Sequence, residues 1–170
     1  MTVTTPVGVD IEGTRIDTDA IVAVSIIRAG DSLLECFMNI VPEAKVGKIL
    51  IQRNEETKKA ELFYSKLPSL ASKNVVLLDP MLATGGSAKA AIQVLLDCGA
   101  REDKIFFLNV VSCPEGLQSI HDTYPAVQIV TGAVDSGLNE KVSNYNNVVL
   151  TVTIFIFDFI FTIIFLCRRT

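Results

Sequence analysis

Two short runs of apolar residues, at 20–27 and 75–79, constrain the fold of this chain most. Runs of this length that are rich in Val, Ile and Leu are typical of strands buried on both faces of a sheet. Two further runs, at 105–111 and 127–134, also predict strands. Because a sheet of such strands leaves no face for water, helices must cover both of its sides.

Segments with a helical pattern lie between these runs. We expect helices from Asp31 or Ser32 to about Ile40, over 87–98 with Gly99 ending the helix, and over 115–122. We expect further strands over 46–51 and 61–64, a short hairpin or edge strand over 7–16, and a polar mobile loop between Arg53 and Ala60. Strands that alternate with helices predict the α/β class, with a mainly parallel sheet and helices on both faces. Ligands bind at the carboxyl ends of strands in such folds, so the loops after Ile27, Ile51, Leu78 and Val111 are candidate sites.

Composition excludes several classes of protein. The 170 residues fit one domain, and a net charge of −4 without a basic patch argues against a nucleic-acid-binding protein. The cysteines at 36, 98, 113 and 167 are scattered, and His121 is the single histidine, so we expect no metal site and no disulfide framework. With no signal peptide pattern at the N-terminus, these features predict a cytoplasmic protein.

The strongest motif is the run 75–88, Val-Val-Leu-Leu-Asp-Pro-Met-Leu-Ala-Thr-Gly-Gly-Ser-Ala. A buried strand ends in Asp79, and a short loop then presents two glycines and two hydroxyls at the start of a helix. Glycines let backbone N–H groups approach a phosphate, and a helix N-terminus favours its negative charge. Residues 84–87 alone would favour an ordinary strand-turn-helix with a serine cap, whereas the full run with Asp79 favours the phosphate site.

The whole run resembles the PRPP-binding loop of type I phosphoribosyltransferases. Asp79-Pro80, where other members have two adjacent acids, narrows the resemblance to the uracil phosphoribosyltransferase family. Residues 25–32, 47–57, 62–68, 113–116 and 134–141 also resemble that family, so the resemblance covers roughly residues 5–141. One departure is Asn54, which stands where the family usually has Asp.

The resemblance implies an enzyme of pyrimidine salvage that joins uracil to PRPP, giving UMP and pyrophosphate. It implies Asp79 as the catalytic residue, facing the ribose hydroxyls and the developing positive charge. The PRPP-binding residues that it implies are Arg28, Ala29, Gly30, Arg53, Asp79, Pro80, Met81, Leu82, Ala83, Thr84, Gly85, Gly86 and Ser87. It further implies Mg²⁺ with the PRPP, a homo-oligomer and, as in some members, GTP as an allosteric activator.

The resemblance stops at Lys141, and the family's uracil-reading segment is not found in residues 142–170. We therefore expect no uracil-binding residue and impaired activity. Residues 148–167 are mostly apolar, carry one charge, Asp158, and are followed by two arginines. Three hypotheses fit this tail: a membrane anchor, an aggregation-prone β segment, or a translated intron, which we favour because Lys-Val-Ser at 141–143 can be encoded by a splice-donor sequence.

Two alternatives to the salvage enzyme stay open. One is a non-catalytic PRPP-binding protein that the tail anchors in a membrane. The other is a phosphoribosyltransferase for a different base, against which Asp79-Pro80 argues.

Overall fold

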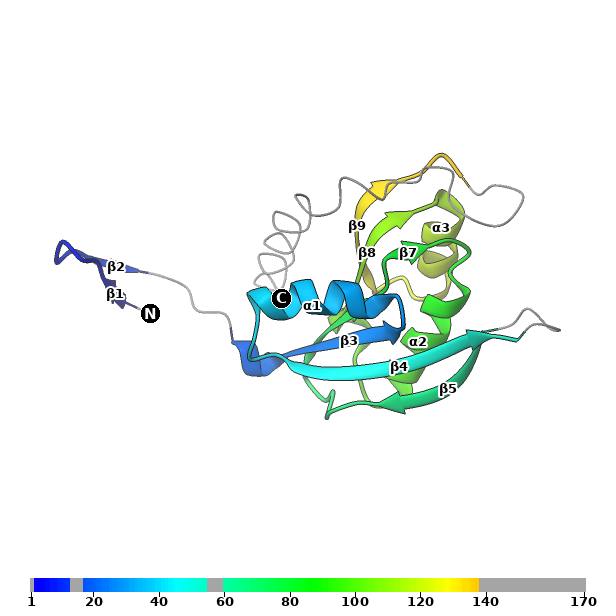
Figure 1. The fold of residues 1–170 in the computed structure, drawn as a ribbon, viewed down its shortest axis with the longest axis horizontal. Coiled ribbons are helices and arrows are strands. Elements are labelled where there is room, and N and C mark those ends of the chain that lie inside the picture. The colour runs from blue at the N-terminus through cyan, green and yellow to red at the C-terminus, as the bar shows by residue number, and fades with distance from the viewer. Residues whose placement is uncertain (1, 13–16, 55–59, 138–170) are drawn as a thin grey trace.

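The computed structural model describes residues 2–12, 17–54 and 60–137. Figure 1 shows a twisted sheet with helices packed against it. The strands are β1 Thr2–Thr4, β2 Asp10–Glu12, β3 Ile21–Ile27, β4 Lys45–Arg53, β5 Ala60–Lys66, β6 Asn74–Leu78, β7 Met81–Leu82, β8 Ile105–Ser112 and β9 Gln128–Val134. The α-helices are α1 Gly30–Ile40, α2 Gly86–Asp97 and α3 Pro114–Thr123.

The main sheet is parallel except at one edge. Its order is β5-β4-β3-β6-β8, β7 continues the line of β6 along β8, and β9 pairs with β8. β4 and β5 pair antiparallel, whereas β3, β4, β6, β8 and β9 run in parallel. The predicted fold class is therefore confirmed, and the carboxyl ends of β3, β4, β6 and β8 lie along one edge of the sheet.

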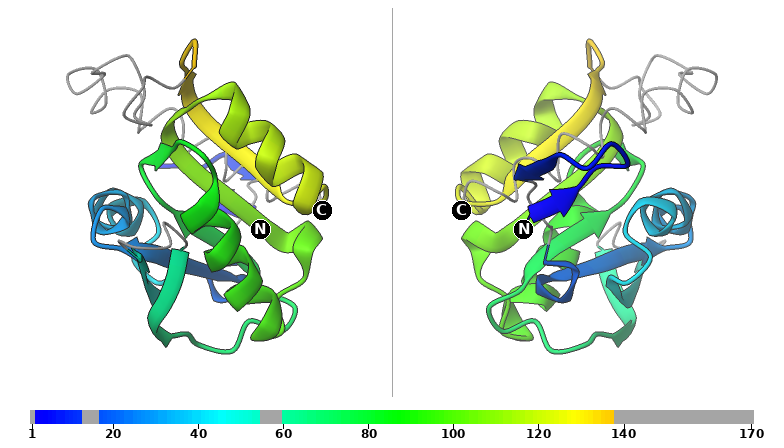
Figure 2. Two further views of the ribbon diagram at one scale, coloured as in Figure 1. Left: turned by 90° about the vertical axis from the view of Figure 1, so that its right-hand side faces the viewer. Right: turned by 90° about the vertical axis from the view of Figure 1, so that its left-hand side faces the viewer.

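Two hydrophobic layers, one on each face of the sheet, pack the sheet against its helices. On one face, Leu33 and Phe37 of α1 pack with Val76 and Leu78 of the sheet. On the other face, α2 and α3 pack against residues of the same strands that point the opposite way, such as Phe107. Figure 2 shows α1 on one side of the sheet and α2 with α3 on the other. This arrangement explains why the central strands are apolar at most positions, with buried Ser25 and Asn109 among the exceptions.

The helix ends fall close to their predicted places. Gly99 follows α2 with a φ of +87°, and its N–H and that of Ala100 donate to Leu96 O (2.9 Å) and Leu95 O (3.0 Å). This is a Schellman motif, which requires the left-handed conformation that glycine adopts without cost. The predicted start of the first helix is wrong, since α1 begins at Gly30 and neither Asp31 nor Ser32 caps it.

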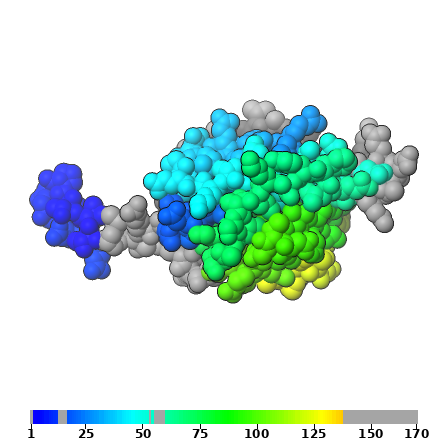
Figure 3. Space-filling view, turned by 90° about the horizontal axis from the view of Figure 1, so that it is seen from below, coloured from blue at the N-terminus to red at the C-terminus, as the bar shows by residue number. Residues whose placement is uncertain are grey.

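The N-terminal hairpin differs from the prediction. A hairpin is one of the two forms that we expected over 7–16, but its strands are Thr2–Thr4 and Asp10–Glu12. Val7 lies in the turn between them, with 84% of its surface exposed. Figures 1 and 3 show the hairpin standing away from the main sheet. The alternation of Val7, Val9 and Ile11 therefore does not mark a face buried in the core.

Two predicted segments lie wholly or partly outside the described residues. The predicted polar loop lies between Arg53 and Ala60, which pair with each other at the ends of β4 and β5. Residues 55–59 of this loop lie outside the described residues. The tail at 142–170 is also outside the described residues, so its three hypotheses stay predictions. Within the described residues, no helix is long and apolar enough to cross a membrane.

The core packing gives a test with a matched control. Phe107 is fully buried, whereas Phe63 on the edge strand β5 is 60% exposed. We expect Phe107→Ala to lower the free energy of unfolding by about 3–5 kcal/mol, because it leaves a cavity in a close-packed layer. The same change at Phe63 should cost less than about 1 kcal/mol, since little apolar area leaves water there. Urea denaturation of both variants measures this, and equal losses would contradict the assignment of the core.

Candidate functional site

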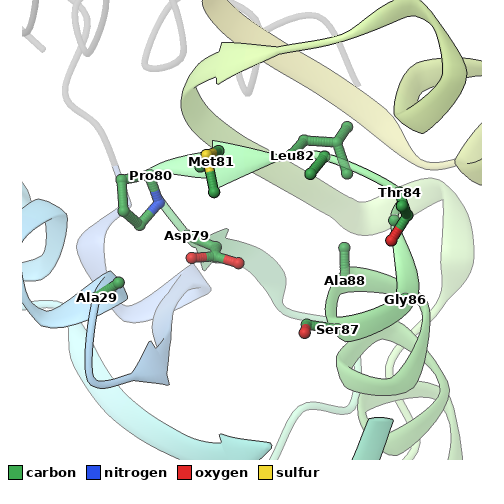
Figure 4. A pocket seen from close by; sticks show the side chains of 11 residues that line it. Ala29, Asp79, Pro80, Met81, Leu82, Thr84, Gly86, Ser87 and Ala88 are labelled. Carbon is green, nitrogen blue, oxygen red and sulfur yellow. The ribbon is translucent and has the colours of Figure 1, made fainter. Parts of the chain in front are cut away.

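A pocket of about 470 Å³ opens at the carboxyl end of β6. Ala29, from the loop after β3, lines it together with residues 79–88. Figure 4 shows the Asp79 carboxylate between Ala29 on one side and Ser87, at the start of α2, on the other. The strand-acid-loop-helix motif of the sequence is therefore the wall of a single cavity.

Backbone hydrogen bonds to β8 fix the position of Asp79. The Asp79 N–H donates to Leu108 O at 3.2 Å, and Pro80 O accepts from the N–H groups of Val110 and Val111 at 3.0 and 3.1 Å. The chain then runs through β7 beside β8 before it turns into α2. Asp79 thus projects from backbone that belongs to the sheet, which holds its carboxyl in place.

The turn into α2 has the conformation that an anion site needs. Gly85 adopts a φ of +81° and immediately precedes the first helical residue, Gly86. The first N–H groups of a helix have no acceptor within the helix and point outward along its axis. With the Thr84 and Ser87 hydroxyls on the same pocket wall, this end of α2 can bind a phosphate-sized anion.

Helix α3 supports this turn from behind. The Cys113 N–H donates to Leu82 O at 3.1 Å, and the Cys113 thiol donates to Ala83 O at 2.8 Å. A Cβ atom on Gly116 would lie 2.3 Å from Ala83 O, so α3 approaches the loop as closely as a glycine allows. Burial is the main cause that raises the pKa of the Cys113 thiol, which keeps it protonated as a donor.

A second pocket of about 600 Å³ adjoins the first, because both are lined by Ala29 and Pro80. It is formed by the end of β3 with the turn that follows, and by the end of β4. Exposed Arg28 brings a positive charge to it, and the peptide bond between Ile27 and Arg28 is cis. One cleft therefore has helix N–H groups at one end and a guanidinium at the other.

Asp79 is the acid of this cleft, and its environment changes its charge. Burial raises the pKa of Asp79 from 3.8 to about 7, because a half-buried carboxylate loses hydration. The group therefore changes charge near neutral pH. A carboxyl tuned in this way in a cleft is a candidate for a catalytic role.

Other residues that the sequence singled out lie in the core, at the end of a strand or outside the two pockets. Gly30 is buried, and a Cβ there would lie 2.3 Å from Leu78 O, so it packs α1 against β6. Leu82 has a side chain that is almost fully buried, although the residue lines the first pocket. Arg53 ends β4 in register with Ala60, and its side chain lies outside what the structure describes. Asn54, the departure from the family pattern, donates through Nδ2 to Glu61 Oε1 at 3.0 Å.

Sequence reasoning missed several residues of the cleft. Ser32 and Gln52 line the second pocket, and the sequence offered no signal for them beyond their place in segments that resemble the family. The supporting contacts of Cys113 and Gly116 were also missed, since both contacts depend on how α3 packs. Among the described residues, no group of three or more His, Cys, Asp and Glu side chains could hold a metal ion.

The model of a known protein family matches residues 1–145, and its description is uracil phosphoribosyltransferase. The chain belongs to the uracil phosphoribosyltransferase family. The predicted family is therefore confirmed, and with it a fold that holds the cleft at the carboxyl ends of the strands.

Curated members of the family are similar over most of this chain. The uracil phosphoribosyltransferase of Dictyostelium discoideum is 48% identical over 141 residues, which are 82% of this chain and 65% of the relative. Uracil phosphoribosyltransferase 1 of Schizosaccharomyces pombe is 48% identical over 140 residues, covering 82% of this chain and 64% of the relative. The chain thus spans slightly less than two thirds of the length of these relatives.

Solved structures agree with the fold. The AQ2163 protein from Aquifex aeolicus superposes with a TM-score of 0.75 at 40% identity, covering 85% of this chain and 68% of that chain. A purine phosphoribosyltransferase from Pyrococcus horikoshii superposes with a TM-score of 0.52 at 16% identity, over 72% of this chain and 82% of that chain. The second likeness concerns the fold alone.

The contact between α3 and the loop can be tested by adding one methyl group. We expect Gly116→Ala to lower the free energy of unfolding by about 2 kcal/mol or more, because the new Cβ meets the Ala83 carbonyl and the Leu82 side chain. Gly86→Ala is the matched control, since its Cβ would have no neighbour closer than 3.8 Å and alanine favours a helix. Chemical denaturation of both variants measures the difference. A Gly116→Ala protein as stable as the control would contradict this packing.

The raised pKa of Asp79 predicts how stability depends on pH. Between about pH 4 and 7 the folded protein keeps a proton that the unfolded chain has released, so the free energy of unfolding falls as the pH rises through this window. Asp79→Asn removes this loss. We expect the variant to exceed the parent by about 2–4 kcal/mol more at pH 8 than at pH 4. Denaturation curves at both pH values measure it, and a pH-independent difference would be evidence against the buried acid.

Proposed function

We propose that this chain transfers the phosphoribosyl group of PRPP to uracil, giving UMP and pyrophosphate. The observation that carries the proposal is the place of Asp79, in a pocket that also contains the N-terminus of α2 and that adjoins a second pocket lined by Arg28. Membership of the uracil phosphoribosyltransferase family supports the choice of substrates.

In this proposal the two ends of the cleft bind the two charged ends of PRPP. The 5′-phosphate binds at residues 84–87, where backbone N–H groups and two hydroxyls can donate to its oxygens. The diphosphate binds at the other end, near the Arg28 guanidinium and the backbone of Ala29 and Gly30. Arg53, at the end of β4, is the second arginine for the diphosphate.

Magnesium enters this proposal as part of the substrate. Mg²⁺ prefers to keep its waters and to bind through substrate phosphates rather than in a cage of protein ligands. We expect chelation with EDTA to abolish turnover without unfolding the protein.

Asp79 is the proposed catalytic residue, and its ionised form stabilises the transition state. The bond from the ribose C1′ to the diphosphate oxygen breaks, and the diphosphate leaves with the bonding electron pair. The bond from C1′ to the uracil N1 forms, and the N1 proton passes to water. Positive charge develops on the ribose as the diphosphate leaves. A fixed carboxylate facing the ribose stabilises that charge more than it stabilises the neutral ground state, and this lowers the barrier.

Further properties of the family are proposed here without an assigned residue. They are recognition of uracil, assembly into a homo-oligomer, a cytoplasmic location and activation by GTP. A rate of UMP formation that rises when GTP is added would support the last of these, and an unchanged rate would refute it.

A direct assay tests the proposed function. The full chain is incubated with uracil, PRPP and Mg²⁺, UMP is measured by chromatography, and PRPP binding is measured by calorimetry. We expect Asp79→Asn to lower kcat/KM by about 10²-fold, the scale of losing one electrostatic group at a transition state. Asp103→Asn is the control, because Asp103 is an exposed acid that pairs with Arg101. PRPP binding without UMP formation in the parent chain would favour the non-catalytic alternative.

The pKa of Asp79 also predicts how PRPP binding depends on pH. The carboxylate accepts hydrogen bonds from the ribose hydroxyls, whereas the protonated acid accepts them less well. Because the pKa of Asp79 is about 7, affinity for PRPP should fall as the pH drops from 8 to 6. In Asp79→Asn this fall should be smaller, and calorimetry at both pH values measures it. An equal fall in the parent and the variant would assign the titration to PRPP itself.

A further inference from the structure

Three side chains from three separate elements meet behind the turn formed by residues 28–30. Ser25 in β3 is fully buried, and its Oγ donates a hydrogen bond to Asp31 Oδ1 at 2.6 Å. Lys48 in β4 donates through Nζ to Asp31 Oδ2 at 3.0 Å. Both oxygens of the Asp31 carboxylate are therefore engaged, one by each of two neighbouring strands.

Asp31 is directly connected to the turn. Its N–H donates to Arg28 O at 3.1 Å, and the next N–H, that of Ser32, donates to Ala29 O at 3.2 Å. Gly30 leaves no space between the turn and Leu78 O. A carboxylate held by β3 and β4 at this point thus fixes how the backbone of residues 28–30 faces the second pocket.

The negative charge of Asp31 lies beside the turn at residues 28–30, and the positive charge of Lys48 balances it. Hydrogen bonds from Ser25 and Lys48 keep the pKa of Asp31 below its usual value despite some burial, so the group is ionised. An ionised carboxylate beside a turn that takes a diphosphate would repel it. The Lys48 ammonium, 3.0 Å away, offsets that negative charge.

The ion pair between Lys48 and Asp31 contributes little to the overall free energy of unfolding. The Lys48 and Asp31 side chains are 43% and 39% exposed, and pairs at such sites contribute little to the free energy of unfolding. Local effects on the turn are therefore its main consequence.

We propose that Lys48 is a positioning residue for diphosphate binding, acting through Asp31 to orient the turn at residues 28–30 and to balance the charge beside it. The proposal rests on the proposed function, in which this turn binds the diphosphate of PRPP.

The first test compares two neighbouring lysines. Lys48→Met removes the contact with Asp31. Lys66→Met is the control, because Lys66 is the residue of β5 opposite Lys48 and its replacement removes the same positive charge. We expect Lys48→Met to raise the Kd for Mg-PRPP and for inorganic pyrophosphate about five- to tenfold, with KM for PRPP rising and kcat and KM for uracil nearly unchanged. Lys48→Arg should restore most of the affinity. Equal effects of Lys48→Met and Lys66→Met would overturn the proposal.

A double variant separates action through Asp31 from direct contact with the diphosphate. If Lys48 acts through Asp31, adding Lys48→Met to Asp31→Asn should change the Kd for pyrophosphate less than twofold, because the partner is already lost. If Lys48→Met weakens binding as much in that background as in the parent, Lys48 contacts the diphosphate itself and the proposal is wrong.

A third measurement needs no ligand and so distinguishes this proposal from the proposed function. Hydrogen exchange at the Asp31 and Ser32 amides reports the opening of the turn. We expect Lys48→Met to accelerate exchange at both amides severalfold and Lys66→Met to leave it unchanged. Unchanged exchange in Lys48→Met would refute the proposal, while a parent chain that binds neither PRPP nor pyrophosphate would refute the proposed function.

Discussion

The burial of β6 between β3 and β8 is the constraint on which the rest of this structure depends. Val75, Leu77 and Leu78 have no exposed surface, and helices cover both faces of the strand. The carboxyl end of β6 is the point at which the chain leaves the core and reaches the pocket, and there apolar Leu78 is followed by Asp79. The first polar residue after the core is thus also the acid at the centre of the cleft.

Support for the cleft comes from residues that do not line its two pockets. Helix α3 packs behind the turn before α2 through Cys113 and Gly116. On the other side, Asp31 ties the turn after β3 to β3 and β4 through Ser25 and Lys48. Both ends of the cleft are therefore turns that neighbouring elements hold in one conformation, and a preformed site of this kind loses little entropy when it binds a charged ligand.

The sequence predicted the strands and helices of the main sheet well, because residues such as Val76 and Phe107 must be apolar whichever neighbour covers them. It placed the N-terminal hairpin less well, since the hairpin lies over 2–12 rather than 7–16, and Val7, Val9 and Ile11, which alternate with Gly and acidic residues, are exposed. Alternation reports the pattern of side chains along a strand and carries no information on whether another layer lies against it.

The sequence by itself determined the family, the α/β class and the strand-acid-loop-helix motif around Asp79, since each depends on residues close together in the chain. Only the tertiary structure decided that the pocket lined by Asp79 adjoins the pocket lined by Arg28, that burial moves the pKa of Asp79 to about 7, and that Lys48 reaches Asp31. These facts arise from strand order and register. Local sequence does not encode them, because they depend on which segments, distant in the chain, come to lie side by side.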